Sequence, residues 1–302
     1  MITVVIPVRN RADIVGRTLD SVASQTRIPD QIVLVDNAST DGTLEVLQRW
    51  AEERENVTVL GEPRLGAAEA RNCGLNVATE EYVMFFDSDD VMPPRHVEEV
   101  CSELERLGMP DIGAFGMECV RLDGSVVRKD FGKGDPMFNH IFHSTLSTQR
   151  YVVRTEFIRS AGGWIEQTPV WNDFLLGVIL LSRQPNIKEL KLTERVKIYA
   201  QEDSITGKNF SSKAGKWEAT LDNCVDALRQ AGLVQYEPLI NYRRAILAGI
   251  YISEGHPEFA SGLMPTPMMR LIARYVAAGG RGVAYLARIS NCFRYTKSNK
   301  TL

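Results

Sequence analysis

Three carboxylates follow a single apolar run in the sequence. The segment YVMFFDSDD, residues 82–90, ends in Asp87, Asp89 and Asp90. Charged groups crowded at the end of a buried element are costly unless something compensates them. Asp87 and Asp89 are two residues apart, so in an extended segment their side chains point the same way. Two hard oxygen ligands in this arrangement suit Mg²⁺ or Mn²⁺ held together with substrate phosphates.

A purely structural interpretation of this segment is an Asp-rich turn in which Asp90 favours the following helix. An isolated D-x-D is a weak motif. Asp36, however, ends a second apolar run, and the stretch PVRN at residues 7–10 ends a third. Polar groups brought to one place by three distant segments favour a ligand site.

The elements that must position these groups follow from the hydrophobic pattern. The apolar runs hardly alternate, which is typical of parallel strands covered on both faces. The expected strands are Ile2–Val8, Gln31–Asp36, Val57–Leu60 and Tyr82–Asp87, and the expected helices between them are Asp13–Ser24, Thr43–Glu53 and Ala67–Ala78. This alternation predicts an α/β fold with an open, mostly parallel, twisted sheet flanked by helices. In such sheets ligands bind beyond the carboxyl ends of the strands.

The pattern changes after Pro94. We expect a helix at His96–Leu107, a hairpin at Asp123-Gly124, a loop over residues 132–146 and an apolar helix within residues 170–183. Helical patterns dominate from Ser212 onward. We therefore predict a catalytic domain at residues 1–210, with parts 1–95 and 96–210, and a C-terminal helical region at 211–302.

Composition limits the class of protein. The chain has 302 residues, 44% of them hydrophobic, and a net charge of −3, which argues against a general nucleic-acid binder. Its five cysteines are scattered without a C-x-x-C pair, as in a reducing compartment. The segment MITVVIPVRN lacks the features of a secretory signal, and no apolar run approaches the roughly 20 residues of a membrane span. We expect a cytoplasmic enzyme.

Four ordered segments carry a resemblance to a known family: VVIPVRNRADIVGRTLDSVASQT, IVLVDNASTDGT, RLGAAEARNCGL and YVMFFDSDD. Together they resemble the family 2 glycosyltransferases of GT-A fold, strongly over residues 1–95 and more loosely to about 210. The resemblance implies inverting transfer of a sugar from a nucleotide-diphosphate donor, usually UDP-linked, with a divalent metal, Mn²⁺ or Mg²⁺. Residues 1–95 would then bind the nucleotide sugar and residues 96–210 the acceptor.

The resemblance assigns donor-binding positions residue by residue. They are Pro7, Arg9, Asn10, Asp13, Asp36, Arg71, Asp87 and Ser88. Asp36 matches the acid that accepts a hydrogen bond from uracil, and Asn37 stands where a second Asp is common. Arg71 matches the arginine that the family places beside the metal-motif carboxylates, although a solvated helix face would also explain it. Asp89 matches the usual metal ligand, while Asp87 lies at the metal or the ribose.

Inversion at the anomeric carbon needs a base that deprotonates the acceptor hydroxyl. In the family this base comes from an ED pair at a helix start. Asn172-Asp173 stands at that place, so Asp173 matches the base and Asn172 replaces the usual Glu. Glu166 is the nearest substitute for that first carboxylate. The structural alternative for Asp173 is a first-turn acid that stabilises its helix.

The segment YAQEDSITG, residues 199–207, resembles the family's H-x-D-S-x-S motif, which closes over the donor phosphates. Gln201 stands where a histidine ligand is often found and is a poorer ligand for the metal. His140 and His143 fall in the expected loop and could serve acceptor or metal, or simply belong to the loop.

Residues 262–302 contain no Asp or Glu but several Arg and Lys interleaved with apolar residues. Basic amphipathic segments bind anionic membrane surfaces. A helix pair packed on the catalytic domain with an ordinary basic face is the alternative. A membrane-facing tail would suit a lipid-linked acceptor in cell-envelope polysaccharide synthesis and a peripheral location on the cytoplasmic face.

Two other functions fit parts of the pattern. A sugar-nucleotide nucleotidyltransferase would need a Gly-rich phosphate loop after the first strand, which PVRNRADIVGR lacks. A degenerate sugar-nucleotide-binding protein without transfer activity is suggested by Asn172 and Gln201. The leading prediction is an inverting, metal-dependent glycosyltransferase acting on a glycan or lipid-linked hydroxyl.

Overall fold

A twisted seven-stranded sheet forms the centre of the computed structural model, which describes residues 1–199 and 209–288. Its strands are β1 (Ile2–Val8), β2 (Gln31–Asp36), β3 (Val57–Gly61), β4 (Tyr82–Phe85), β5 (Ile112–Ala114), β8 (Tyr151–Arg154) and β9 (Ile187–Glu189). They lie in the order β3-β2-β1-β4-β8-β5-β9, and β8 alone runs antiparallel to its neighbours β4 and β5. A three-stranded sheet orders β10 (Val196–Tyr199), β6 (Met117–Val120) and β7 (Val126–Lys129).

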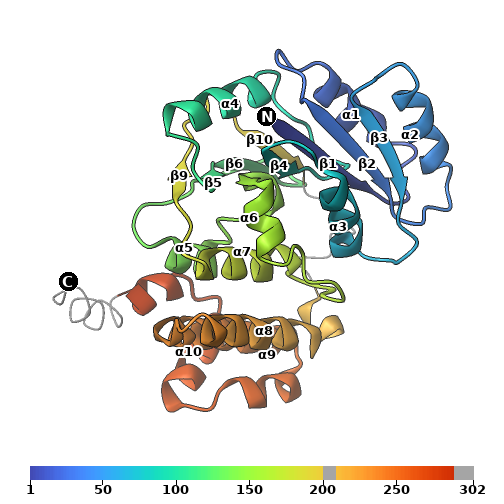
Figure 1. Cartoon of the computed structure of the whole chain (residues 1–302). Coiled ribbons are helices and arrows are strands. Elements are labelled where there is room, and N and C mark those ends of the chain that lie inside the picture. The colour runs from blue at the N-terminus through green and yellow to red at the C-terminus, as the bar shows by residue number, and fades with distance from the viewer. Residues whose placement is uncertain (200–208, 289–302) are drawn as a thin grey trace.

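Helices cover the sheet and extend beyond it (Figure 1). The α-helices are α1 (Val15–Ala23), α2 (Thr43–Ala51), α3 (Ala67–Val77), α4 (His96–Arg106), α5 (Pro136–His143), α6 (Thr155–Ser160), α7 (Asn172–Ser182), α8 (Lys216–Gln230), α9 (Glu237–Ser253) and α10 (Pro267–Ala277). Short 3₁₀ turns lie at Thr148–Arg150, Phe210–Lys213, Val234–Tyr236 and Pro257–Leu263. Helices α8, α9 and α10 form a layer beyond α7, on the side away from β1–β3 (Figure 1).

The apolar strands are buried on both faces, as expected. In β1, Val4 and Ile6 belong to the core cluster that contains residues of α1 and α4, whereas Val5 belongs to the cluster of α3 and α7. The latter cluster also contains residues of α8 and α9, such as Leu221, so the helical layer shares its core with the sheet. No helix among the described residues is long and apolar enough to cross a membrane.

The strand order places the ligand edge. The chain passes from β1 outward to β2 and β3, then returns across to β4 on the other side of β1. This reversal creates a switch point beyond the carboxyl ends of β1 and β4, where open α/β sheets bind ligands.

Several expected boundaries were wrong. Strand β4 ends at Phe85, so Asp87 follows the strand instead of lying in it. The first helix begins at Val15, which leaves Asp13 in the preceding turn. The expected loop at 132–146 contains helix α5, because Asp135 caps its start by accepting a hydrogen bond from the Phe138 backbone N–H at 2.8 Å, and Pro136 occupies the first turn.

Candidate active site

A cavity of about 750 Å³ opens at the carboxyl edge of the sheet. Its lining includes the end of β1, the start of α3, residues 87–90 after β4, residues 167–173 leading into α7, and Ile198 and Tyr199 at the end of β10. The predicted residues in its lining are Pro7, Arg9, Arg71, Asp87, Ser88, Asp89 and Asp173. The topology therefore brings the proposed metal motif and the proposed base into one cavity.

Arg71 is a buried residue of the cavity wall that contacts several of the other site residues. Its side chain is 7% exposed, and its Nη2 donates to Asp87 Oδ1 at 2.8 Å. The guanidinium carbon lies 4.4 Å from the ring centroid of Trp164, and Nη1 donates to Asn172 Oδ1 at 3.4 Å. A solvated helix face is thus ruled out for Arg71, which connects the segment after β4 with the start of α7.

Asp89 lies at the same edge, in the turn after Asp87. Burial, and then the nearby charge of Asp87, raises the pKa of Asp89. Arg11 approaches its carboxylate at 3.8 Å, and Arg17 Nη2 donates to its backbone carbonyl at 2.5 Å. A carboxylate disfavoured by burial and by a second carboxylate gains from a bound cation.

These residues fit a divalent metal only in part. No group of three or more His, Cys, Asp or Glu side chains arranged to hold a metal occurs among the residues that the structure describes. Asp87 and Asp89 can supply two oxygen ligands from the cavity wall. An octahedral ion would need its other oxygens from phosphate and water. Gln201, the weak third ligand of the prediction, lies outside the described residues.

Asp90 is not the helix cap suggested by the sequence, because α4 begins only at His96. Its Oδ1 accepts a hydrogen bond from the Tyr199 backbone N–H at 3.1 Å, and its Oδ2 accepts one from Gln149 Nε2 at 2.5 Å. Burial, followed by the charges of Asp87 and Asp89, raises the pKa of Asp90 to about 8. Asp90 therefore attaches the end of β10 to the floor of the cavity.

Asp36 is the last residue of β2 and Asn37 follows it, and the two side chains make different contacts. Asp36 is buried; its Oδ2 accepts from the Ser39 N–H at 3.2 Å, while its buried Oδ1 has no hydrogen-bond partner among the described residues. A buried carboxylate oxygen without a hydrogen-bond partner is suited to accept a hydrogen bond from an N–H of a ligand. Asn37 donates to the backbone carbonyls of Glu62 and Arg64 and accepts from the Gly66 N–H at 2.9 Å. It thereby holds the loop between β3 and α3 against β2.

Three predicted donor residues do not line the cavity: Asp36, Asn10 and Asp13. Asn10 lies in the left-handed region with φ 50°. Its Oδ1 accepts from the Thr40 N–H at 2.9 Å, and its backbone N–H donates to Ser39 Oγ at 3.0 Å. It therefore joins the ends of β1 and β2. Asp13 is exposed and lies outside the lining residues.

Asp173 occupies the first turn of α7 and faces the cavity. Its Oδ1 accepts from the Phe174 N–H at 2.8 Å, and burial raises its pKa, partly opposed by the charge of Arg71. The residue before α7, Trp171, adopts φ 52°, a strained conformation for a bulky side chain. A carboxylate with a raised pKa in a cavity is suited to accept a proton.

Glu166 does not replace the missing first carboxylate. Its Oε2 pairs with Arg64 Nη1 at 2.5 Å, and its Oε1 accepts from Asn72 Nδ2 at 3.3 Å. Glu166 is absent from the cavity lining, where Asn172 occupies the position beside Asp173.

Both histidines lie in α5, and the contacts of His140 are structural. His140 is fully buried and stacked on Phe174; its Nδ1 accepts from the Leu146 N–H at 3.1 Å, so its Nε2 donates to the Phe174 carbonyl at 2.9 Å. Burial lowers the pKa of His140 to about 4. His143 ends the same helix, and burial also lowers its pKa.

The prediction missed Glu69, which lies in the same AAEARN segment as Arg71. Its Oε1 accepts from the Gln167 N–H at 3.0 Å and so holds the loop that leads to α7. Gly66, with φ 153°, leaves room for this carboxylate: a Cβ there would lie 1.8 Å from Glu69 Oε2. Glu69 is buried although it is charged. Its position two residues before Arg71 was the only sequence feature that could have indicated a role near the site.

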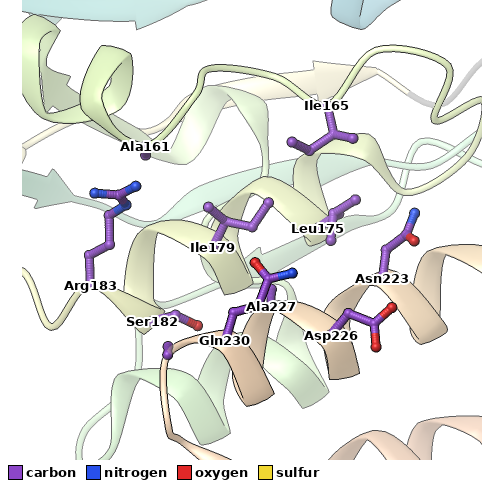
Figure 2. Close-up of a pocket in the computed structure, with 11 residues that line it drawn as sticks. Ala161, Ile165, Leu175, Ile179, Ser182, Arg183, Asn223, Asp226, Ala227 and Gln230 are labelled. Atoms are coloured by element: carbon purple, nitrogen blue, oxygen red, sulfur yellow. The ribbon is translucent and has the colours of Figure 1, made fainter.

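A second cavity of about 590 Å³ lies between α7 and α8 (Figure 2). Its apolar wall includes Leu175 and Ile179 of α7, and Asn223, Asp226 and Gln230 of α8 form a polar rim. None of the carboxylates after β4 lines it, and neither does Asp173. The cavity at the sheet edge is therefore the candidate active site.

Comparison with known proteins shows sequence similarity in the N-terminal part of the chain, which contains β1 to β4. Residues 3–116 match the family model described as Glycosyl transferase family 2. The uncharacterized glycosyltransferase YibD of Escherichia coli is 35% identical over 97 residues, which cover 32% of this chain and 28% of YibD. The putative teichuronic acid biosynthesis glycosyltransferase TuaG of Bacillus subtilis is 40% identical over 92 residues, 30% of this chain and 36% of TuaG.

A third relative is WfaP of Escherichia coli, a UDP-Glc:alpha-D-GlcNAc-diphosphoundecaprenol beta-1,3-glucosyltransferase. It is 33% identical over 90 residues, 30% of this chain and 36% of WfaP. The chain thus spans about a third or less of the length of these curated relatives.

Solved structures resemble the whole described fold. TarS residues 1–349 of S. aureus in complex with UDP has a TM-score of 0.62 at 18% identity, covering 92% of this chain and 87% of that chain. The mannosyltransferase PcManGT of Pyrobaculum calidifontis, in complex with GDP-Man and Mn²⁺, has a TM-score of 0.55 at 20% identity, covering 96% and 79%. These similarities confirm the expected fold class, a mostly parallel α/β sheet flanked by helices.

Proposed function

Because residues 3–116 match the model of glycosyl transferase family 2, we propose that this chain transfers a sugar, with inversion, from a nucleotide-diphosphate donor to an acceptor hydroxyl. The observation that carries the proposal is one cavity of about 750 Å³ lined by Asp87, Asp89, Arg71 and Asp173. It combines a site for a charged diphosphate with a carboxylate suited to accept a proton. The donor we favour is a UDP-sugar.

The donor occupies the edge between β1, β2 and β4. The partnerless Oδ1 of Asp36 accepts the N–H of a pyrimidine base, and Pro7 and Arg9 line the path from the base to the phosphates. Asn10 and Asn37 act indirectly, because each holds loops that shape this edge. A diphosphate leaving group suits a rim with basic groups such as Arg9 and Arg11.

Asp87 and Asp89 would hold Mn²⁺ or Mg²⁺ with the donor diphosphate. When bound, such an ion neutralises the negative charge of the departing diphosphate. Arg71 fixes the position of Asp87, because its Nη2 donates to this carboxylate at 2.8 Å. Glu69 and Asn172 then fix the loop before α7 relative to Arg71.

Asp173 is the general base. It accepts the proton of the acceptor hydroxyl as that oxygen attacks the anomeric carbon, and the bond to the diphosphate breaks on the opposite face. The raised pKa of Asp173 brings its proton affinity closer to neutral pH.

The acceptor that we propose is a hydroxyl of a cell-envelope glycan, either free or lipid-linked. TuaG is described as a teichuronic acid biosynthesis enzyme and WfaP as acting on a diphosphoundecaprenol-linked sugar. These names support the acceptor class. In this proposal residues 96–210, most of which lie beyond the segment that matches the family model, select the specific acceptor.

The first experiment is a panel of nucleotide sugars tested for thermal stabilisation of the full chain with and without Mn²⁺. We expect a UDP-sugar to stabilise the chain in a metal-dependent manner, and Asp89→Asn to abolish the metal dependence. Donor hydrolysis or transfer by the wild type then separates an enzyme from a protein that only binds the donor. Absence of any nucleotide-sugar stabilisation would contradict the proposed function.

We also propose that the chain acts at the cytoplasmic face of a membrane, held there peripherally. The supporting feature is the outer face of α10, where Met268, Leu271 and Tyr275 are exposed beside Arg270 and Arg274. Residues 262–302 contain no acidic residue that would repel an anionic surface. Cosedimentation with vesicles containing phosphatidylglycerol tests the proposal.

A further inference from the structure

Asn72 of α3 binds both backbone groups of one residue that lies 92 positions further along the chain. Its Oδ1 accepts a hydrogen bond from the Trp164 N–H at 2.9 Å, and its Nδ2 donates to the Trp164 carbonyl at 2.8 Å. A primary amide carries an acceptor and donors in one plane, so two bonds to the same residue fix both its position and its orientation. Asn72 therefore holds the backbone of Trp164 against α3.

Two glycines bring the backbone of Trp164 to Asn72. Gly162 and Gly163 follow α6 with φ values of 95° and 70°, in the left-handed region that favours glycine. A Cβ at Gly163 would lie 2.7 Å from Asn72 Oδ1. A side chain at this position would push the backbone of Trp164 away from the amide. The close approach of the two segments thus depends on the sequence GGW.

The indole ring of Trp164 contacts both the end of β4 and Arg71. Trp164 is 1% exposed, and its ring meets that of Phe85, the last residue of β4, edge to face with the centroids 5.1 Å apart. The guanidinium carbon of Arg71 lies over the indole ring at 4.4 Å from its centroid. An aromatic face attracts a cation placed over it. The ring is therefore a fixed surface against which Arg71 is held.

Arg71 depends on this surface for its position. Its Nη2 donates to Asp87 and its Nη1 to Asn172, but its Nε is buried without a hydrogen-bond partner among the residues that the structure describes. A long arginine side chain has many rotamers, and each contact along it removes some of them. A shift of the indole ring would therefore shift the two Nη atoms that contact Asp87 and Asn172.

Asn72 itself does not line the cavity, whereas Arg71 and Asp87 do. Any effect of Asn72 on a bound donor must therefore pass through Trp164 and Arg71. The alternative is that Asn72 only attaches the segment between α6 and α7 to α3. Attachment alone would contribute to the stability of the chain and leave the properties of the folded site unchanged.

We propose that Asn72 is a positioning residue for the transfer reaction: it fixes Trp164, whose ring places Arg71, and Arg71 in turn places Asp87. The inference rests on the proposed function and deepens it, because it makes the metal-binding carboxylate depend on a residue outside the cavity. When the ring is displaced, Asp87 loses the hydrogen bond that holds it. Weaker binding of Mn²⁺ with UDP and slower turnover follow in a chain that remains folded.

The first experiment follows the indole ring in the full chain labelled with 5-fluorotryptophan. The chain has four tryptophans, and Trp164→Phe identifies the ¹⁹F resonance of residue 164. The test variant is Asn72→Asp, which keeps the size of the side chain but replaces its N–H donors by a carboxylate oxygen. We expect the Trp164 resonance to shift beyond its line width. A resonance at the wild-type position would overturn the proposal.

The second experiment measures Mn²⁺ affinity in the presence of UDP, and turnover, for the same variant. We expect Asn72→Asp to weaken Mn²⁺ binding and to lower kcat by about tenfold each, as is usual when the support of a metal-binding group is removed. In an Arg71→Met background the same change should have little further effect, because effects that act through one residue are not additive. Equal losses in both backgrounds would show that Asn72 does not act through Arg71 and would overturn the proposal.

Asn56→Asp is the matched control. Asn56 Nδ2 also donates to a backbone carbonyl, that of Pro29 at 2.8 Å, and neither residue lines the cavity. This variant should lose stability in urea without a change in Mn²⁺ affinity, kcat or the Trp164 resonance. Asn72→Ser, a smaller perturbation, keeps the test decisive should Asn72→Asp fail to fold.

Failure of this inference is distinguishable from failure of the proposed function. If Asn72→Asp binds Mn²⁺ and UDP and turns over like the wild type, the inference is overturned while the proposed function stands. If the wild type binds neither UDP nor Mn²⁺, the proposed function is contradicted. The ¹⁹F spectrum still decides in that case, because a shifted Trp164 resonance supports the role of Asn72 and an unchanged one overturns it.

Discussion

Asp173 combines three properties of a base: a cavity position, a raised pKa and a place at the rigid start of α7. Asp173→Asn keeps the shape but cannot accept a proton, so kcat should fall about 10²–10⁴-fold. UDP affinity should change little, because the residue lies outside the donor edge. Turnover and nucleotide titration measure the two effects.

The matched control is Asp13→Asn, which changes an exposed carboxylate outside the cavity lining and should leave both quantities near wild type. Because burial raises the pKa of Asp173, the acidic limb of the kcat profile should lie above the ordinary aspartate value of about 4. Equal loss of UDP binding and turnover in Asp173→Asn would contradict the role of base.

His96 illustrates a different residue-scale effect, on stability. It is buried against Phe115, neither ring nitrogen has a hydrogen-bond partner among the described residues, and burial lowers its pKa from 6.5 to about 4. Between pH 6.5 and 4, His96 is therefore protonated in the unfolded chain but neutral in the folded chain. Its contribution to stability is present above pH 6.5 and is lost as the pH falls from 6.5 to 4, by about 3 kcal/mol at most.

His96→Leu should remove this part of the acid sensitivity while losing no hydrogen bond. Urea unfolding at about pH 7 and about pH 4.5 should show a smaller loss for the variant than for the wild type. The buried His140 should still contribute to the acid sensitivity of both the variant and the wild type. An identical loss in His96→Leu and wild type would refute the explanation.

At the scale of elements, the contact between α5 and α7 depends on one glycine. A Cβ at Gly177 would lie 2.3 Å from two ring atoms of His140, which is itself fixed by two hydrogen bonds. Gly177→Ala should therefore push α7 away from α5 and cost about 1–3 kcal/mol of stability. Since α7 begins with Asn172 and Asp173, kcat should fall as well.

Gly16→Ala is the matched control for that prediction. Gly16 lies in α1, where a Cβ would have nothing within 4 Å, so the position should tolerate alanine without loss of stability. Urea unfolding and turnover of both variants measure the difference. Equal stabilities would mean that α5 and α7 separate easily.

The elements that could be predicted from the sequence are those whose signal is local. The runs around Val4, Val33 and Val83 are apolar on both faces, and each forms a parallel strand. Helix α5 was expected to be a loop because Gly132 and Gly134 precede it, although Asp135-Pro136 is a helix-start signal. The insertion of β8 between β4 and β5 depends on long-range pairing, which no local pattern encodes.

The candidate site divides in the same way. Asp87, Asp89, Arg71 and Asp173 occur in short motifs, so the sequence could suggest them before their cavity was seen. The stacking of Arg243 on Trp171 could not be predicted, because α9 and the start of α7 are far apart in sequence. The burial of Asp90 under Gln149 and Tyr199 depends equally on tertiary contacts.

At the scale of the molecule, the outer face of α10 is the surface that we propose meets the membrane. Met269 and Ile272 are buried, while Met268 and Leu271 are 59% and 67% exposed on another face. The double variant Met268→Ser, Leu271→Ser should bind anionic vesicles several-fold more weakly, because about 25 cal/mol per Å² of apolar contact is lost. Cosedimentation at low and physiological salt measures the effect.

Leu122→Ser in the β6–β7 hairpin is the control, since Leu122 is similarly exposed at 58% but lies outside the basic region. It should bind vesicles like the wild type. Unchanged binding of the α10 variant would assign this face to another partner, and a change in oligomeric state would identify a second copy of the chain.

The position of β8 has a consequence for how segments could be exchanged between related chains. Arg154 and Val153 of β8 pair with Tyr82 and Val83 of β4, while the opposite edge of β8 pairs with β5. The segment that matches the family stops at residue 116, before β8. A chimera joined there would set a strand of one parent between two strands of the other. Exchange of the segment after residue 116 between related chains therefore requires that the incoming β8 remain compatible with the retained β4 and β5, or that the crossover lie elsewhere.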